Sequence, residues 1–165
     1  MKAPSKAVIL AAGLGTRMRP LTCATPKPLL PLWGVPLLDH TLNLLRAWGV
    51  RDVLLNLHHG ADAIVRHVRT RPPPSLRIAF SFEPAILGTG GALRRAEWFP
   101  DDDPFWMVNA DIAADVNPAP FLRAGRRTTF SAARGVRRAP RAVSLRNGET
   151  TSPGIPIPGL VKRRR

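Results

Sequence analysis

The first 122 residues alternate between apolar runs of strand length and amphipathic segments with a helical period. A continuous apolar run such as KAVILAA (6–12) is typical of a parallel strand that is buried on both faces. In PLLDHTLNLLRAWG (36–49), leucines and a tryptophan recur at spacings of three and four, which predicts an amphipathic helix. The same patterns predict strands over 6–12, 52–57, 76–82 and 104–111, and helices over 36–49, 61–70 and 90–99.

This alternation predicts an α/β fold. Strands separated by helices of about ten residues build right-handed βαβ units and a parallel sheet with helices on both faces. We therefore expect a Rossmann-like, three-layer α/β/α arrangement with a mainly parallel sheet. In such sheets ligands bind beyond the carboxyl ends of the strands. This rule places three segments along one edge: the loop 13–31, the segment 83–91 (EPAILGTGG) and Asp111.

The loop 13–31 (GLGTRMRPLTCATPKPLLP) has the composition of a phosphate-binding segment. Gly13 and Gly15 permit positive φ angles and a close approach of the backbone to a ligand. Arg17 and Lys27 supply positive charge suited to a polyphosphate. The full dinucleotide fingerprint and the P-loop pattern are both absent from the sequence. A flexible connector with solvated charges is the alternative interpretation.

The charge is unevenly distributed along the chain. A formal net charge of +14 would by itself indicate a nucleic-acid or other anionic partner. Residues 1–122, however, hold 13 Lys and Arg against 10 Asp and Glu, whereas residues 123–165 hold 12 against 1. The apolar periodicity also stops there. We therefore predict a nucleotide-binding domain over 1–122 and a basic, irregular, low-complexity tail over 123–165.

The tail is rich in arginine, alanine, glycine and proline. Such a composition is typical of GC-rich DNA translated out of frame, and we expect a frameshift near residue 123. The alternative is a genuine basic arm, disordered on its own and able to neutralise phosphates. The sequence contains no RNA-binding motif and no zinc-finger spacing, so we expect no specific nucleic-acid partner.

The cellular setting can also be predicted from composition. The apolar runs fall short of the roughly 20 residues that a membrane-spanning helix needs. The start of the chain lacks the pattern of a secretory signal. The single cysteine, Cys23, cannot form an internal disulfide. We expect a reducing, cytoplasmic setting without a membrane partner, and these patterns leave the oligomeric state open.

Three motifs together resemble one enzyme family. LAAGLGTRMRPLTCATPKPLLPLWGVPLL (10–38) is similar, almost residue for residue, to the signature of the nucleoside-diphosphate-sugar pyrophosphorylases. ILGTGGAL (86–93) resembles the second nucleotide-binding segment of that family, and VNADI (108–112) resembles its metal-binding aspartate at a strand end. The similarity is greatest to the bacterial mannose-1-phosphate guanylyltransferase and N-acetylmuramate-1-phosphate uridylyltransferase types.

This resemblance implies a function and a set of site residues. Members of the family join a sugar 1-phosphate to a nucleoside triphosphate with release of pyrophosphate, using Mg²⁺. By resemblance, Asp111 holds Mg²⁺, and Lys27 and Arg17 act on the reacting phosphates. The residues that the resemblance assigns to nucleotide binding are Ala11, Ala12, Gly13, Gly15, Thr16, Arg17, Glu83 and Gly88.

Two functions remain open at this point. The first is the sugar-1-phosphate nucleotidyltransferase reaction. The second is nucleotide binding without turnover, or nonspecific polyanion binding by the tail, because the tail matches neither the sugar-binding segments nor the second metal-binding aspartate of the family. We expect Asp115 to be a surface residue, His58 and His59 not to form a metal pair, and most of the four tryptophans to pack in the core.

Overall fold

A six-stranded sheet forms the centre of the protein, in the order β5-β4-β1-β6-β8-β9. The computed structural model describes residues 3–101 and 103–125, and the backbone of short segments at 131–132, 142–146, 149–150 and 160–161. The strands are β1 (Lys6–Leu10), β4 (Asp52–Leu57), β5 (Arg77–Phe82), β6 (Phe105–Asn109), β8 (Ala142–Arg146) and β9 (Glu149–Thr150). All neighbours from β5 to β8 are parallel, and β9 runs antiparallel to β8. The predicted, mainly parallel sheet is therefore confirmed.

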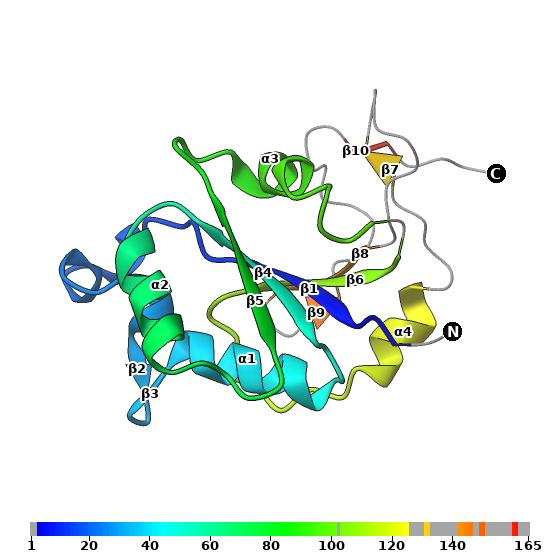
Figure 1. Cartoon of the computed structure of the whole chain (residues 1–165), viewed down its shortest axis with the longest axis horizontal. Coiled ribbons are helices and arrows are strands. Elements are labelled where there is room, and N and C mark those ends of the chain that lie inside the picture. Colours follow the sequence, from blue (N-terminus) through cyan, green and yellow to red (C-terminus); the bar gives the residue numbers. More distant parts are fainter. Residues whose placement is uncertain are drawn as a thin grey trace.

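Helices cover both faces of this sheet (Figure 1). On one face lie α1 (Leu37–Ala47), α2 (Ala61–Thr70) and α4 (Ala119–Gly125), and on the other lies α3 (Gly88–Arg95). Successive residues of a strand point to opposite faces. Ile9 and Leu55 accordingly belong to the larger core under α1, whereas Val8 and Leu54 pack on the side of α3. The three-layer α/β/α arrangement is confirmed.

The loop between β1 and α1 is a series of short turns. It contains the 3₁₀ turns η1 (Thr16–Met18), η2 (Leu21–Cys23) and η3 (Lys27–Leu29), followed by the hairpin strands β2 (Pro31–Leu32) and β3 (Val35–Pro36). In Figure 1 this loop projects beyond the sheet beside α2. The sequence patterns predicted a loop here but not its turns.

Up to residue 122, the predicted strands and helices match the observed ones closely except for the helix predicted over 90–99. This helix begins earlier, at Gly88, because its first turn is glycine-rich and lacks the usual helix-start signal, and it ends earlier, at Arg95.

The tryptophans divide evenly between the core and the surface. Trp48 and Trp106 are buried with ring centroids 4.7 Å apart, whereas Trp33 and Trp98 are exposed. The expectation that most of them pack in the core is therefore wrong.

Two strands of the sheet, β8 and β9, lie within the predicted tail. Ala142–Leu145 of β8 pair in parallel with Phe105–Val108 of β6, although the apolar periodicity predicted no strand there. Two further short strands, β7 (Ser131–Ala132) and β10 (Leu160–Val161), form a separate antiparallel pair. Most of residues 123–165 lie outside the described part of the chain, and the frameshift and the basic arm stay predictions.

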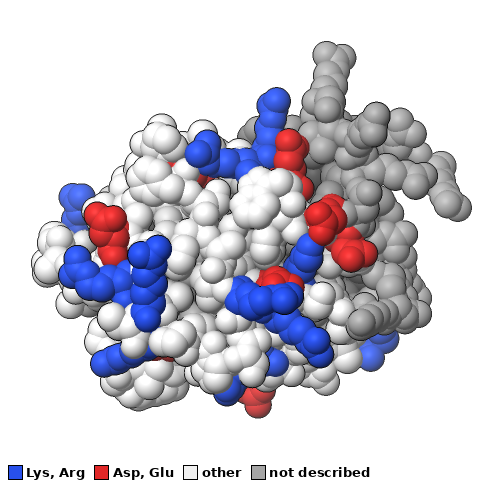
Figure 2. Space-filling view, in the orientation of Figure 1, with Lys and Arg blue, Asp and Glu red and all other residues white. Residues whose placement is uncertain are grey.

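The described surface is mixed in charge. Figure 2 shows acidic and basic side chains interspersed over one face, with uncharged surface between them. This agrees with the near balance of charges counted over residues 1–122. Among the described residues, no helix combines the length and the apolar character needed to cross a membrane.

Candidate functional site

The carboxyl ends of β1, β4, β5 and β6 meet at one edge of the sheet. Leu10 at the end of β1 is in register with Asn56 of β4 and with Asn109 of β6. Beyond these positions the Ala11 N–H donates to the Asn56 carbonyl at 2.9 Å, and the Ala110 N–H donates to the Leu10 carbonyl at 3.2 Å. The loop 13–31, the segment 83–91 and Asp111 therefore begin at the same edge, as the fold rule predicted.

Gly15 gives the loop its first sharp turn. It precedes η1 with φ +65°, a left-handed conformation that favours glycine. The hydroxyl of the buried Thr22 donates to the Gly15 carbonyl at 2.8 Å, and a Cβ at position 15 would lie only 2.9 Å from Thr22 Cγ2. Gly13 does not adopt the positive φ that glycine permits. An added Cβ there would meet nothing within 4 Å, so the backbone is open to a ligand.

Pro26 fixes the far part of the loop to the turn before α2. Gly60 has φ +65°, and a Cβ at this glycine would overlap the ring of the buried Pro26. The Leu29 N–H donates to the Pro26 carbonyl at 2.8 Å. This contact between two distant segments holds the backbone that leads directly into Lys27.

Lys27 and Asp111 form an ion pair at the centre of this edge. The ammonium of Lys27 contacts Asp111 Oδ2, and the two side chains are 30% and 28% exposed. Asp111 follows β6, and its neighbour Ile112 donates its N–H to the hydroxyl of the buried Thr41 on α1 at 3.2 Å. Because both charges are partly exposed, each can reach a ligand as well as its partner.

The remaining predicted phosphate-binding residues, Thr16 and Arg17, lie in η1 and are exposed. Ala12, a predicted nucleotide-binding residue, lies two positions after β1 and is partly buried. The guanidinium of Arg17 has no ion pair or hydrogen bond with any described residue. Its five donors are therefore available to an anion.

Glu83 is placed differently from the other predicted nucleotide-binding residues. Its side chain is buried, with 1% of the residue exposed. Oε1 accepts a hydrogen bond from Asn56 Nδ2 at 2.8 Å, and Oε2 accepts one from the Leu87 N–H at 3.0 Å. Both carboxylate oxygens thus already bind donors of the chain. Gly88, which begins α3, is exposed with φ +68° and open space around its Cβ position.

Asp111 is the acidic side chain best placed to bind a metal at this edge. Magnesium takes one or two carboxylates and completes its coordination with water and substrate phosphates. A single, partly exposed carboxylate beside a phosphate loop fits that requirement. Groups of three or more His, Cys, Asp or Glu side chains in metal-binding geometry do not occur among the described residues. His58 instead donates through Nδ1 to the Glu83 carbonyl at 2.7 Å, and Asp115 is exposed.

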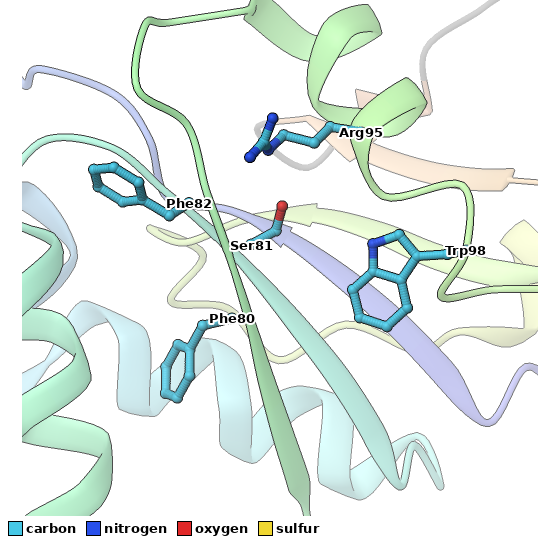
Figure 3. A pocket seen from close by; sticks show the side chains of 5 residues that line it. All are labelled: Phe80, Ser81, Phe82, Arg95 and Trp98. Carbon is cyan, nitrogen blue, oxygen red and sulfur yellow. The ribbon is translucent and has the colours of Figure 1, made fainter.

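A separate hollow of about 400 Å³ lies at the edge strand β5. Figure 3 shows Arg95 and Trp98 on one side of the strand with Ser81, while Phe80 and Phe82 turn away from them. None of the residues predicted for the nucleotide site lines this hollow. The strand ends, where the predicted charges meet, are therefore the better candidate site.

Several residues that shape the site were not predicted from the sequence. Asn56 was detectable, because an amide inside the apolar strand DVLLNL must find a partner. The others act through contacts between distant segments, which no local pattern reveals. They are Thr22, Thr41 and Gly60.

Comparison with known proteins gives one family match and several close relatives. A family model described as nucleotidyl transferase matches residues 6–140. A mannose-1-phosphate guanyltransferase of Aspergillus fumigatus is 41% identical over 113 residues, which are 67% of this chain and 31% of that protein. An N-acetylmuramate alpha-1-phosphate uridylyltransferase of Caulobacter vibrioides is 42% identical over 113 residues, which are 67% of this chain and 47% of that protein.

A solved structure shares the fold. HddC from Yersinia pseudotuberculosis, crystallised in complex with GMP-PN, has a TM-score of 0.69 and 29% identity, covering 78% of this chain and 57% of that chain. This chain spans about a third to a half of the length of the curated relatives described above.

Proposed function

The chain belongs to the nucleotidyl transferase family, and we propose that it is the nucleotide-binding part of an enzyme that joins a sugar 1-phosphate to a nucleoside triphosphate. The products of this reaction are a nucleoside-diphosphate sugar and pyrophosphate. Relatives named for guanylyl and uridylyl transfer to sugar phosphates support the reaction class.

The ion pair between Lys27 and Asp111 carries this proposal. It joins the loop after β1 to the end of β6, at the edge where ligands of parallel sheets bind. A triphosphate would offer oxygens to the ammonium, because charge-assisted contacts with phosphate are strong. The carboxylate of Asp111 would then be released for Mg²⁺, which prefers oxygen ligands. One pair of side chains thereby provides both the anion contact and the metal contact that the reaction needs.

The reaction requires the protein to position the two reactants and to neutralise charge on the phosphate oxygens. A phosphate oxygen of the sugar 1-phosphate forms a bond to the α-phosphorus, and the bond from that phosphorus to the β-phosphate bridging oxygen breaks. The electron pair of the broken bond leaves with pyrophosphate. Lys27 and Arg17 would donate hydrogen bonds to the phosphate oxygens as negative charge shifts among them. When bound at Asp111, Mg²⁺ would supply further charge neutralisation.

The nucleoside would lie along the backbone on either side of the phosphate loop. We assign Ala11, Ala12 and Gly13 to the base and ribose, and Gly88 to the base. The open space at Gly13 and Gly88 supports this assignment, because the backbone at both positions can be approached closely. Gly15, Thr16 and Arg17 are assigned to the triphosphate. Water-soluble phosphorylated substrates and the single cysteine agree with a cytoplasmic setting.

Nucleotide binding without turnover is the second candidate function. It is favoured because the tail 123–165 matches neither the sugar-binding segments nor the second metal-binding aspartate of the family, which leaves Asp111 as the carboxylate paired with Lys27. A nucleotide could bind there without the attacking oxygen being aligned, because binding alone does not orient two reactants.

Pyrophosphate release distinguishes the two functions. The assay uses Mg²⁺, each common nucleoside triphosphate and a panel of hexose 1-phosphates. Turnover by the chain that is lost in Asp111→Asn but kept in the control Asp115→Asn supports the enzyme. Nucleotide binding without pyrophosphate release supports the second function. If the chain neither binds a nucleotide nor releases pyrophosphate, both candidate functions are contradicted.

A further inference from the structure

Glu83 is a buried carboxylate without a cationic partner among the described residues. Burying a charged group is costly unless hydrogen bonds satisfy it. Its two oxygens are satisfied by Asn56 Nδ2 and by the Leu87 N–H, at 2.8 and 3.0 Å. The main chain of Glu83 is held as well, because its N–H donates to the Leu57 carbonyl at 2.7 Å and its carbonyl accepts from His58 at 2.7 Å.

These bonds connect the two segments that are proposed to bind the nucleoside. Ala11, at the start of the first segment, donates its N–H to the Asn56 carbonyl. The side chain of Asn56 donates to Glu83, and Glu83 accepts from Leu87, the residue before Gly88. An uninterrupted series of hydrogen bonds therefore runs from the end of β1 to the start of α3.

The second segment has little room to move independently of this series. Gly88 takes φ +68° directly after Leu87. An added Cβ at Gly91 would come within 2.5 Å of Leu87 Cβ, so the first turn of α3 packs closely over Leu87. A displacement of Leu87 would therefore displace Gly88, the residue assigned to the base.

We propose that Glu83 is a positioning residue, which sets the second nucleotide-binding segment relative to the first through Asn56 and Leu87 and does not contact the nucleotide itself. This inference rests on the proposed nucleotide site. It assigns to Glu83 an indirect role in base binding, in place of the direct contact that the family resemblance implies.

The conservative variant Glu83→Gln distinguishes hydrogen bonding from charge. Gln keeps one oxygen for the Leu87 N–H and replaces the other by an NH₂ group. Asn56 Oδ1 is buried and has no partner among the described residues. A rotation of the Asn56 amide would present this oxygen to the new NH₂ group. Glu83→Gln therefore keeps both links. Glu83→Ala breaks both, and Asn56→Ala breaks the link between Asn56 and Glu83.

Hydrogen exchange of the free protein tests the link without any nucleotide. We expect Glu83→Ala and Asn56→Ala to speed amide exchange in a peptide spanning 84–91 by about five- to tenfold, the scale of one lost hydrogen bond. Glu83→Gln and the control Ser81→Ala, a neighbouring buried polar residue with no hydrogen bond to Asn56 or Glu83, should leave it unchanged. Unchanged exchange in both alanine variants would overturn the proposal.

Titration with two ligands tests the effect on base binding. The probes are each common nucleoside triphosphate with Mg²⁺, and inorganic tripolyphosphate with Mg²⁺, which has no base. We expect Glu83→Ala and Asn56→Ala to weaken nucleotide binding by about five- to tenfold and to leave tripolyphosphate binding within about twofold. The double variant should be no weaker than Glu83→Ala alone, because both residues act through one path.

Three results of these titrations would also overturn the inference. Weaker nucleotide binding in Glu83→Ala with unchanged binding in Asn56→Ala would make Glu83 a direct ligand. Equal losses for nucleotide and tripolyphosphate would indicate general damage to the fold. Loss in Glu83→Gln as large as in Glu83→Ala would make the charge essential. If the wild-type chain bound no nucleotide while the exchange results held, the proposed function would fail and the link between Glu83, Asn56 and Leu87 would stand.

Discussion

Lys27 and Asp111, which lie 84 positions apart in the sequence, form an ion pair at the carboxyl edge of the sheet. One residue belongs to the loop after the first strand, and the other follows β6. Neither side chain is deeply buried, so the pair adds little to the stability of the fold. Its place at the edge where parallel sheets bind ligands supports the functional role that we propose for it.

Removal of Lys27 should leave the fold almost as stable as before. Surface ion pairs contribute about 0–1 kcal/mol, because solvent screens both charges. We expect Lys27→Ala to change the free energy of unfolding by less than about 1 kcal/mol in urea titrations without ligand. A loss of several kcal/mol would mean that the ion pair is a structural element and not a pair held ready for ligands.

Gly15 and Gly13 should respond differently to alanine. At Gly15 the φ of +65° and the contact with Thr22 should make Gly15→Ala destabilising by about 1–2 kcal/mol and weaken nucleotide binding. At Gly13 the added methyl group meets no atom within 4 Å. We expect Gly13→Ala to keep its stability and still to weaken nucleotide binding, because its methyl group would occupy the ligand's space.

Thermal unfolding and nucleotide titration of both variants check this prediction. If Gly13→Ala binds as well as the wild type, the nucleotide does not approach the backbone there. If Gly15→Ala is as stable as the wild type, the turn does not require glycine.

Gly60→Ala should disturb the loop through Pro26. Both Gly60 and Gly49 have positive φ, but only at Gly60 would a Cβ overlap another residue. Gly49→Ala therefore measures the backbone strain alone, about 1–2 kcal/mol. We expect Gly60→Ala to be more destabilising than Gly49→Ala in urea denaturation, and to weaken nucleotide binding as Lys27 moves. Equal destabilisation of the two variants would show that Pro26 adapts freely.

The stability contributed by Asp52 should depend on pH. Two hydrogen bonds from Arg77, at 2.5 and 2.8 Å, hold the pKa of this carboxyl below its ordinary value of 3.8, partly opposed by burial. A pKa that is lowered in the folded state adds stability above pH 3.8, and this stability is lost as the pH falls through the lowered pKa.

Asp52→Asn tests this dependence. We expect the variant to be less stable than the wild type by less than about 1 kcal/mol at pH 7, because Arg77 is largely exposed. The difference should shrink as the pH falls below 3.8, in denaturation curves measured at several pH values. If the difference in stability between Asp52→Asn and the wild type stayed constant well below pH 3.8, the substitution would have removed packing and not a charge interaction.

The strands and most of the helices could be predicted because their apolar patterns are local. The run DVLLNL and the helix after it have the bounds that the sequence indicated, Asp52–Leu57 and Ala61–Thr70. The edge at which Asp111 meets the loop also followed, because parallel strands end together.

The supports of the site could not be predicted, because they join distant segments. Pro26 lies against Gly60, Thr41 binds Ile112, and Asn56 binds Glu83, with no pattern of spacing to reveal any of these pairs. The contacts of Glu83 could not be predicted either. The family resemblance implies a nucleotide contact for this residue, whereas its burial and its donors show that the chain itself occupies both oxygens.

Calorimetric titration of nucleoside triphosphate with Mg²⁺ tests the central claim most directly. We predict that the chain binds at least one common nucleoside triphosphate, and that Arg17→Ala and Lys27→Ala each weaken it by about 1.5–3 kcal/mol, the scale of a charge-assisted contact. The control is Arg46→Ala, an exposed arginine in the last turn of α1, which should bind as the wild type does. Equal affinity of the wild type, Arg17→Ala and Lys27→Ala would contradict the assignment of this loop to the nucleotide.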